Sequence, residues 1–405
     1  MKNYRTIDDC DFKGKTTILR VDINSPVNKK GKVEVSDRSI EAAKTIRELS
    51  NKKAKLVVLA HQGRKGRDDF LPLKQHAKIL TKYSKKKVKF IDDIIGKKAV
   101  KAVKSLKNGE IILLNNVRFL PDETEDKTPK QHSKSQLVRV LSPLADVFVN
   151  DAFSAAHRSH ASMAGFTTIL PSYIGRIMEK EIGSLEKIFT RMKISKHDTF
   201  ILGGAKPEDP LEIMEHMLKA GTLEMVLVTG IVGNLFLIAD GNNLGQKTVD
   251  FLEEKGYLKF LPQTKKIWKK YKKKIMIPMD LAEDFHSKRK EILVEDLPSK
   301  YQLMDIGTKT ISKYTKIIKK SKNIVMKGPA GVYEDDKFAI GTKIILKAVK
   351  NSKGKSLIGG GHTLSALKKF RISKKGYDHV SLAGGALITY LSGKKLPALE
   401  ALKKS

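Results

Sequence analysis

Short apolar runs alternate along the chain with longer stretches in which apolar residues recur at helical spacing. The runs are rich in Val, Ile and Leu, which is typical of strands that are buried on both faces of a parallel sheet. In the first half they predict strands at 16–19, 56–59, 111–114 and 146–149. In the second half they predict strands at 199–202, 225–228, 275–277, 323–326, 356–358 and 379–382. This alternation indicates an α/β fold built from βα units.

A helical pattern at 174–189 lies between the two groups of strands. Its apolar residues are Ile174, Ile177, Met178, Ile182, Leu185 and Phe189. A chain of 405 residues with 40% hydrophobic content is long enough to bury two cores. We therefore predict an N-terminal domain at 1–172, a connector helix at 173–190, a C-terminal domain at 191–388 and a C-terminal segment at 389–405.

The single cysteine, Cys10, cannot form an intramolecular disulfide, which is typical of a reducing compartment. The stretch at 1–12 contains acidic residues and lacks the apolar run of a signal peptide. The most apolar stretch, 225–239, is interrupted by polar and glycine residues and is too short to cross a bilayer. We interpret it as a strand, a loop and a helix, and we expect a cytoplasmic protein with no membrane partner.

The formal net charge of +35 raises the alternative of nucleic-acid or membrane-surface binding. The excess is mostly lysine, in runs such as 85–87 and 265–274, whereas specific nucleic-acid readers favour arginine forks and stacking aromatics. No helix-turn-helix, zinc-finger or RNP-type motif accompanies the charge. We therefore interpret it as a solvated surface that attracts small polyanions, and we expect no dedicated nucleic-acid partner.

Polar clusters follow nearly every predicted strand, at the carboxyl edge where open parallel sheets bind ligands. In the first half these clusters hold arginine, histidine, aspartate and asparagine, at 20–26, 61–64, 116–119 and 150–160. Guanidinium groups bind phosphate oxygens through paired hydrogen bonds. We therefore expect the first half to bind a small acid that carries phosphate.

In the second half the clusters are rich in glycine, at 203–206, 230–234, 328–331, 359–363 and 383–386. Glycine lets backbone amides approach phosphate groups at helix N-termini. Each cluster alone has a plainer interpretation, because a single glycine turn is more often a tight connection. Likewise, His61, His157 and His160 could be structural histidines. The order and combination of the clusters favour a binding site.

Several segments carry a resemblance that runs from about Arg20 to Ala386. They are RVDINSP, AHQGR, NNVRF, NDAFSAAHRSHAS, LGGAKPED, MKGPAGVYE, GGGHT and SLAGGA. In these segments and in their order, the chain resembles the phosphoglycerate kinase family. The resemblance implies two Rossmann-like domains, each a parallel sheet flanked by helices, that face each other across a cleft.

The resemblance also implies an activity, which is reversible phosphoryl transfer from 1,3-bisphosphoglycerate to ADP, giving 3-phosphoglycerate and ATP in glycolysis and gluconeogenesis. It implies Mg²⁺ bound with the nucleotide, hinge closure about the connector helix, and return of the C-terminal segment to the first domain. The expected partners are thus these substrates, and we expect a monomer.

The site residues follow from the resemblance by motif. Those implied to bind 3-phosphoglycerate or the acyl phosphate are Asp22, Asn24, Arg38, His61, Gln62, Gly63, Arg64, Arg118 and Arg158. Those implied to bind the nucleotide are Gly204, Ala205, Lys206, Gly230, Pro329, Glu334, Gly360, Gly361, His362 and Thr363. In the family, the arginine at the position of Arg38 faces the transferring phosphoryl group, Lys206 would lie on the phosphates, and Glu334 would bind the ribose.

In-line phosphoryl transfer needs positioning and positive charge and no general base. Arg38 and Lys206 would supply the charge, and backbone amides at glycine turns, including Gly361 and Gly384, would donate to phosphoryl oxygens. Water must be excluded, because the acyl phosphate is otherwise hydrolysed.

Three positions depart from the commonest pattern of the family. His362 stands where many members have Asp, and Mg²⁺ prefers oxygen to imidazole nitrogen, so no metal ligand is assigned. Pro210 stands where a further lysine is common, which leaves one cation missing. Lys327 replaces a frequent Asn, and it either contacts the nucleotide or faces solvent.

Two other function classes remain as alternatives. One is a basic protein that holds polyanions without turnover, since fold does not fix function; the combination of Arg38, Arg64, Arg118 and Lys206 argues against it. The other is an NAD-dependent dehydrogenase. It lacks support because no G-x-G-x-x-G opens a helix after a strand. Nor does an acidic residue stand about twenty positions beyond such a turn.

Overall fold

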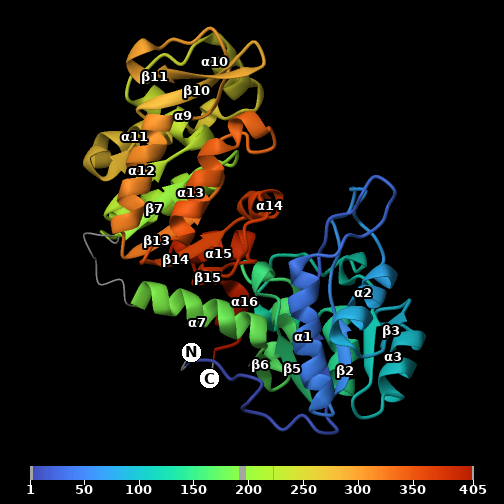
Figure 1. The fold of residues 1–405 in the computed structure, drawn as a ribbon. Helices are drawn as coiled ribbons and strands as arrows, with labels where there is room; N and C mark the ends of the chain where they lie inside the picture. The colour runs from blue at the N-terminus through green and yellow to red at the C-terminus, as the bar shows by residue number, and fades with distance from the viewer. Residues whose placement is uncertain (1–2, 191–197, 222, 404–405) are drawn as a thin grey trace. The chain divides into compact units, whose positions relative to one another are not determined.

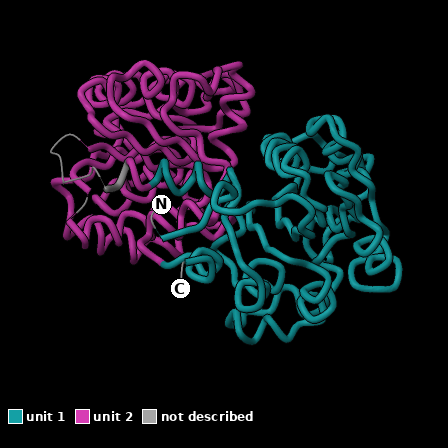
Figure 2. Tube along the Cα trace, turned by 90° about the horizontal axis from the view of Figure 1, so that it is seen from below, with its two compact units in different colours: residues 1–185, 395–405 teal, residues 186–394 magenta. Residues whose placement is uncertain are grey.

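The computed structural model describes residues 3–190, 198–221 and 223–403, apart from the side chains of 188–190. The chain divides into two compact units (Figures 1 and 2). Unit 1 comprises Met1–Leu185 and Lys395–Ser405, and unit 2 comprises Glu186–Lys394. The first division falls inside the predicted connector helix at 173–190, and the second falls inside the predicted C-terminal segment at 389–405. The predicted domain ends at 1, 191 and 405 lie outside the described residues.

Unit 1 is built on a parallel sheet with the strand order β3-β4-β2-β1-β5-β6. Its strands are β1 (Thr16–Arg20), β2 (Lys55–Leu59), β3 (Val88–Ile91), β4 (Ile111–Leu114), β5 (Val147–Asn150) and β6 (Ser172–Ile174). Its helices are α1 (Asp37–Asn51), α2 (Lys74–Ser84), α3 (Lys97–Lys104), α4 (Pro129–His132), α5 (Gln136–Leu141), α6 (Ala161–Ala164) and α16 (Pro397–Glu400). Helix α7 (Arg176–Thr190) contains the division between the units.

The strands of unit 1 form because their apolar runs are buried on both faces of the sheet. Ile18 and Leu19 of β1 and Val57 and Val58 of β2 are each at most 1% exposed. Full burial of such a side chain contributes about 1.5–3 kcal/mol. Leu19 and Val58 belong to a core that also includes residues of α1 and α2. Figure 1 shows these helices flanking the sheet.

Unit 2 is built on a second parallel sheet, with the order β15-β14-β13-β7-β8-β9. Its strands are β7 (Asp198–Leu202), β8 (Met225–Val228), β9 (Ile275–Met276), β13 (Asn323–Lys327), β14 (Lys355–Gly359) and β15 (His379–Val380). A smaller antiparallel sheet has the order β11-β10-β12 and consists of β10 (Asp280–Phe285), β11 (Lys288–Leu293) and β12 (Leu303–Ile306).

The helices of unit 2 alternate with the strands of the parallel sheet. They are α8 (Glu208–Lys219), α9 (Gly230–Ala239), α10 (Gln246–Glu254), α11 (Leu261–Tyr271), α12 (Thr308–Lys320), α13 (Ile340–Lys350), α14 (Gly361–Lys369) and α15 (Gly384–Leu391). Helices α12 and α13 run side by side in Figure 1. No helix in the described ranges combines the length and apolar character that spanning a membrane requires.

Short 3-10 helices join these elements. In unit 1 they are η1 (Val117–Phe119), η2 (Ser142–Leu144), η3 (Phe153–Ala155) and η4 (Gly165–Thr168). In unit 2 they are η5 (Leu258–Phe260), η6 (Lys272–Lys274), η7 (Val294–Asp296) and η8 (Asp336–Phe338).

The structure confirms the predicted α/β class and a strand at each predicted place, with ends shifted by up to two residues. It also confirms that 225–239 is a strand, a turn and a helix. The strands β3, β6, β10, β11 and β12 were not predicted. Strands β10 and β11 carry many charged residues because an antiparallel pair can leave one face in solvent.

Candidate functional site

In unit 1 the carboxyl ends of β4, β2, β1 and β5 are neighbours, because these strands are adjacent in the sheet. The predicted residues Asp22 and Asn24 follow β1, and His61–Arg64 follow β2. Arg118 follows β4, and Arg158 follows β5. The parallel sheet therefore gathers these side chains at one edge, which we call the basic site.

Asp22 and Arg38 form an ion pair at the basic site. Arg38 Nη1 lies 3.1 Å from Asp22 Oδ2, and Ser154 Oγ donates a hydrogen bond to the same oxygen. Burial raises the pKa of the Asp22 carboxyl, but the charge of Arg38 and the hydrogen bonds from Ser154 and the Asn24 amide together lower it by more. As a result, its pKa lies below the ordinary value. Asp22 is thus a buried carboxylate that holds the guanidinium of Arg38.

His61 is buried and contacts Arg20, which is itself only 1% exposed. Arg20 Nη2 lies 3.0 Å from His61 Nδ1. A guanidinium only donates hydrogen bonds, so Nδ1 must accept and the proton of a neutral ring lies on Nε2. Burial holds the pKa of His61 well below its ordinary value. The charges of Arg20, Arg118 and Arg158 also lower it, whereas Asp22 raises it. His61 is therefore neutral and offers an Nε2–H donor.

Gln62 and Gly63 hold the loops of the basic site together. Gln62 Oε1 accepts from the Ser25 amide and contacts His76 Nε2, whereas Gln62 Nε2 donates to the carbonyls of Ser25 and Asp69. All four hydrogen-bonding positions of the amide are thus used within unit 1. The amide of Gly63 donates to Asn24 Oδ1.

Three further arginines complete the basic site. Arg118 Nη1 donates to the Gly63 carbonyl, and burial, with Arg158 and Arg20, lowers the pKa of Arg118 to about 10. Burial and then Arg64 lower the pKa of Arg158, while Arg64 itself is exposed. Each guanidinium thus disfavours the charge on its neighbours. A bound anion would offset this repulsion and stabilise the cluster.

In unit 2 the glycine loops lie at the carboxyl ends of β15, β14, β13, β7 and β8, which are adjacent strands. They pack directly on one another. A Cβ on Gly328 would lie 2.0 Å from the Gly203 carbonyl oxygen, and one on Gly230 would lie 3.1 Å from the Gly204 amide nitrogen. Gly204, Gly230 and Gly328 also have positive φ. These glycines are therefore needed for the contact between loops.

Gly361 and Gly384 differ from the other loop glycines. Apart from the adjoining residues and the helix's own backbone, no atom lies within 4 Å of the Cβ that alanine would place at either position. Gly361 begins α14 and Gly384 begins α15, so their amides lie among the unpaired N–H groups of a helix N-terminus. The space over both glycines allows a ligand to approach these amides.

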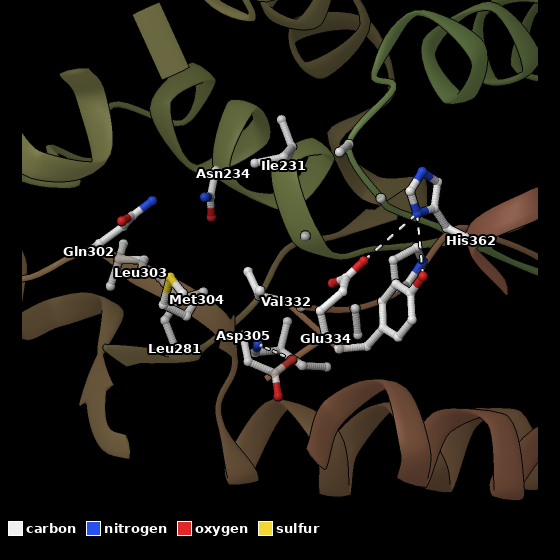
Figure 3. Close-up of a pocket in the computed structure, with 18 of the residues that line it drawn as sticks. Ile231, Asn234, Leu281, Gln302, Leu303, Met304, Asp305, Val332, Glu334 and His362 are labelled. Carbon is white, nitrogen blue, oxygen red and sulfur yellow. Dashed lines mark hydrogen bonds and ion pairs between the residues drawn. The ribbon is translucent and has the colours of Figure 1, made fainter. Parts of the chain in front are cut away.

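A cavity of about 140 Å³ lies beside these loops (Figure 3). Its lining is mostly apolar and comes from α9, β12 and the loops after β7 and β13: Gly204, Ala205, Gly230, Ile231, Asn234, Phe251, Leu281, Gln302, Leu303, Met304, Asp305, Ile306, Pro329, Ala330, Gly331, Val332, Tyr333, Glu334 and His362. An apolar cavity with a few polar groups at its rim suits a flat base attached to a polar tail.

His362 and Glu334 lie at one end of this cavity, as Figure 3 shows. His362 Nδ1 lies 3.9 Å from Glu334 Oε1 and 3.5 Å from Tyr333 Oη. Thr363 is buried and accepts a hydrogen bond from the amide of Gly328, which ties α14 to the loop after β13. The start of α14 is thus fixed next to the cavity.

The structure places most of the predicted nucleotide residues together. Gly204, Ala205, Gly230, Pro329, Glu334 and His362 line the cavity, and Gly360, Gly361 and Thr363 form the start of α14. Lys206 and Gly384 do not line the cavity, and Lys206 is exposed in the loop between β7 and α8. The binding and catalytic roles of these residues stay predictions.

Residues 7–394 match the family model described as "Phosphoglycerate kinase". The chain belongs to the phosphoglycerate kinase family. It is 44% identical to phosphoglycerate kinase of Methanobacterium bryantii over 98% of this chain and 97% of that one. It is 45% identical to that of Sulfurisphaera tokodaii over 100% of this chain and 96% of that one.

A solved structure gives the same result for the fold. The crystal structure of phosphoglycerate kinase from Pyrococcus horikoshii OT3 is similar to this chain with a TM-score of 0.91 and 37% identity, covering 98% of each chain. The arrangement of two parallel-sheet α/β units flanked by helices is therefore that of the phosphoglycerate kinase family.

Several residues of the two sites were given no role by sequence reasoning. Arg20 lies within the RVDINSP segment of the family, but its contact with His61 depends on the pairing of β1 with β2. The cavity residues Leu303–Ile306 belong to the antiparallel sheet, which no apolar run indicated. Arg20 lay within the cluster predicted at 20–26, but sequence reasoning gave it no role, and the structure shows it as the buried last residue of β1.

Proposed function

We propose that this chain catalyses reversible phosphoryl transfer from 1,3-bisphosphoglycerate to ADP, giving 3-phosphoglycerate and ATP. The observation that carries the proposal is the gathering of the family's motif residues at two sheet edges. In unit 1 they form a cluster of cations, and in unit 2 they line an apolar cavity next to helix N-termini.

The basic site of unit 1 would bind the phosphorylated acid. Arg64, Arg118 and Arg158 offer guanidinium groups to its phosphate or carboxylate oxygens. His61 offers its Nε2–H and stays neutral, so it contributes a hydrogen bond and no charge. Gln62 and Gly63, which bond within unit 1, position the loops.

The cavity of unit 2 would bind the nucleotide. Its apolar walls suit the adenine base, and Glu334 at the rim would accept from the ribose hydroxyls. The phosphates then lie at the start of α14, where the amides near Gly361 and His362 donate to them and the helix dipole favours negative charge. Lys206 adds an exposed positive charge from the loop after β7.

Transfer between the two substrates needs positive charge and alignment and no proton abstraction from a side chain. Arg38 would stabilise the charge of the transferring phosphoryl group, and its ion pair with Asp22 would hold the Arg38 guanidinium in place. Lys206 and the Gly384 amide would act from the nucleotide side. Movement of the units about α7 would exclude water from the acyl phosphate.

Magnesium is typical of a nucleotide substrate. Nowhere in the described part of the chain do three or more His, Cys, Asp or Glu side chains gather as ligands. The start of α14 offers an imidazole, and Mg²⁺ prefers oxygen ligands. We therefore propose that the ion comes with the nucleotide, held by phosphate oxygens and water.

The test is a coupled assay with 3-phosphoglycerate, ATP and Mg²⁺ on the parent chain, on Arg38→Ala and on Lys206→Ala. Arg139→Ala and Lys265→Ala remove an exposed cation of the same type from each unit and serve as matched controls. We expect turnover in the parent and in both controls, and a loss of at least about 100-fold in kcat for the two site variants.

Turnover that is absent from the parent chain would refute the activity and leave a polyanion-binding protein. Turnover that persists at the parental rate in Arg38→Ala and Lys206→Ala would refute the assigned roles alone.

A further inference from the structure

Lys327 is the one lysine among the buried residues of the described chain, at 7% exposed. It is the last residue of β13, a central strand of the parallel sheet, and it pairs with Leu202 of β7 and Gly359 of β14. The sequence left open whether Lys327 faces solvent, and its burial excludes that alternative. Burying an ammonium group is costly unless it is paired, so its position calls for an explanation.

Asp209 is the partner of this buried lysine. Lys327 Nζ lies 3.0 Å from Asp209 Oδ2, and Asp209 lies in the first turn of α8. Within the described residues, Nζ forms no other hydrogen bond. An ammonium group has three donors, so two remain for a ligand. The side chain of Asp209 is 24% exposed, so the pair lies next to solvent.

Apart from Asp209, Lys327 has two helix N-termini beside it. A Cβ on Gly360 would lie 3.6 Å from Lys327 Cγ, which places the lysine stem beside the residue before α14. Asp209 places the ammonium group beside the first turn of α8. Helix N-termini carry partial positive charge and repel cations. An anion in this place would be attracted by the lysine and by both helix ends.

The loops also connect Lys327 to the proposed phosphate position. Its carbonyl accepts from the Gly203 amide at 2.9 Å, and the next residue, Gly328, donates to Thr363 Oγ1 at 2.9 Å. Lys327 is therefore fixed between the loop that carries Lys206 and the start of α14. A structural role alone would not need the charge, because an apolar side chain would fill the same space without desolvation.

We propose that Lys327 binds the phosphate chain of the nucleotide, with Asp209 holding its ammonium group in position beforehand. This inference rests on the proposed function, because it assumes a nucleoside diphosphate or triphosphate in unit 2. It assigns the charge neutralisation at the phosphates to a buried, preset cation on β13, in addition to the exposed Lys206.

The test measures the affinity of the full chain for ADP and for adenosine by isothermal titration calorimetry at low salt. The variants are Lys327→Met, which keeps length without charge, and Lys327→Met with Asp209→Asn, which leaves no unpaired carboxylate if the single variant folds poorly. Lys322→Met is the matched control, because Lys322 is exposed and precedes the opposite end of β13.

We expect both Lys327 variants to bind ADP at least tenfold more weakly than the parent, with adenosine affinity unchanged within twofold. Lys322→Met should match the parent for both ligands. ADP affinity equal to the parent in the variants, or an equal loss for ADP and adenosine, would overturn the inference. A parent chain that binds neither ligand would overturn the proposed function and the inference with it.

Discussion

Arg38 lies in the first turn of α1, and its Nη1 is 3.1 Å from Oδ2 of the buried Asp22. A cation at a helix N-terminus is unfavourable to the helix dipole. The carboxylate of Asp22 therefore offsets a local electrostatic cost, and it ties α1 to the loop after β1 at the point where the phosphoryl group is proposed to bind.

We predict that Asp22→Asn lowers kcat more than it changes KM for 3-phosphoglycerate, because Arg38 loses its anchor. The variant should also lose roughly 2 kcal/mol of stability at pH 7, which is typical of a hydrogen bond to a charged group. Denaturant unfolding and the coupled assay measure the two effects. Asp68→Asn, which removes an exposed carboxylate, is the control.

The stability effect of Asp22 should depend on pH in a defined direction. Its pKa in the folded protein lies below the ordinary value near 3.9, so its contribution is complete above about pH 4 and is lost as the pH falls through the folded pKa. The difference between parent and Asp22→Asn should therefore shrink in acid. A difference that grows in acid would contradict this assignment.

Asp151 should produce the opposite dependence. Its Oδ1 accepts from the amides of Ile177 and Met178 at the start of α7. Burial raises the pKa of Asp151 to about 7, although Thr45, these amides and Arg176 lower it. The folded state thus binds a proton that the unfolded state has released, and stability from this group falls as the pH rises from about 4 to about 7.

We therefore predict that Asp151→Asn gains stability relative to the parent over this interval, by up to about 1.4 kcal/mol for each pH unit. Urea unfolding at several pH values between 4 and 8 measures the effect. Asp126→Asn, an exposed carboxylate, should show no such trend. A parent-to-variant difference that stays constant across the interval would count against a protonated Asp151.

The loop glycines should separate into two classes on replacement by alanine. Gly328 has a φ of 88°, and a Cβ there would lie 2.0 Å from a backbone oxygen, so Gly328→Ala should cost more than about 2 kcal/mol of stability. Gly361→Ala meets no atom within 4 Å, so it should unfold at the parental temperature and bind ADP more weakly. Thermal unfolding and calorimetric titration test the pair. Equal stability losses would show that Gly361 is also structural.

His362→Asp should reduce the magnesium concentration needed for half-maximal activity, because a carboxylate at the start of α14 supplies an oxygen ligand. His362 is 54% exposed, so the change should not disturb packing. His362→Asn is the control, since it has a similar shape without the charge. An identical magnesium requirement in His362→Asp and His362→Asn would contradict the prediction.

Much of the parallel sheets could be predicted because a buried strand needs an apolar run, as in Ile111–Leu114 and Met225–Val228. The antiparallel sheet of unit 2 could not. Its strand Lys288–Leu293 begins with charged residues and becomes a strand through its pairing with Asp280–Phe285. That sheet supplies one wall of the cavity, so the cavity could not be predicted from the sequence either.

The polar residues of the two sites could be named from their motifs, but their contacts could not. Sequence position cannot show that Lys327 lies 3.0 Å from Asp209, because 118 positions separate them and only the order of β13 and β7 brings them together. Likewise, Gln62 follows a strand as a ligand-binding residue would, yet its amide bonds entirely within unit 1.

The return of Lys395–Ser405 to unit 1 bears on the order in which the chain folds during synthesis. The amide of Ala398 donates to the Ala156 carbonyl, and Lys403 forms a β-bridge with Tyr4. The ribosome therefore synthesises unit 2 before the segment from Lys395 onward can reach unit 1. The part of the chain that is made first therefore acquires these contacts only after unit 2 has been synthesised.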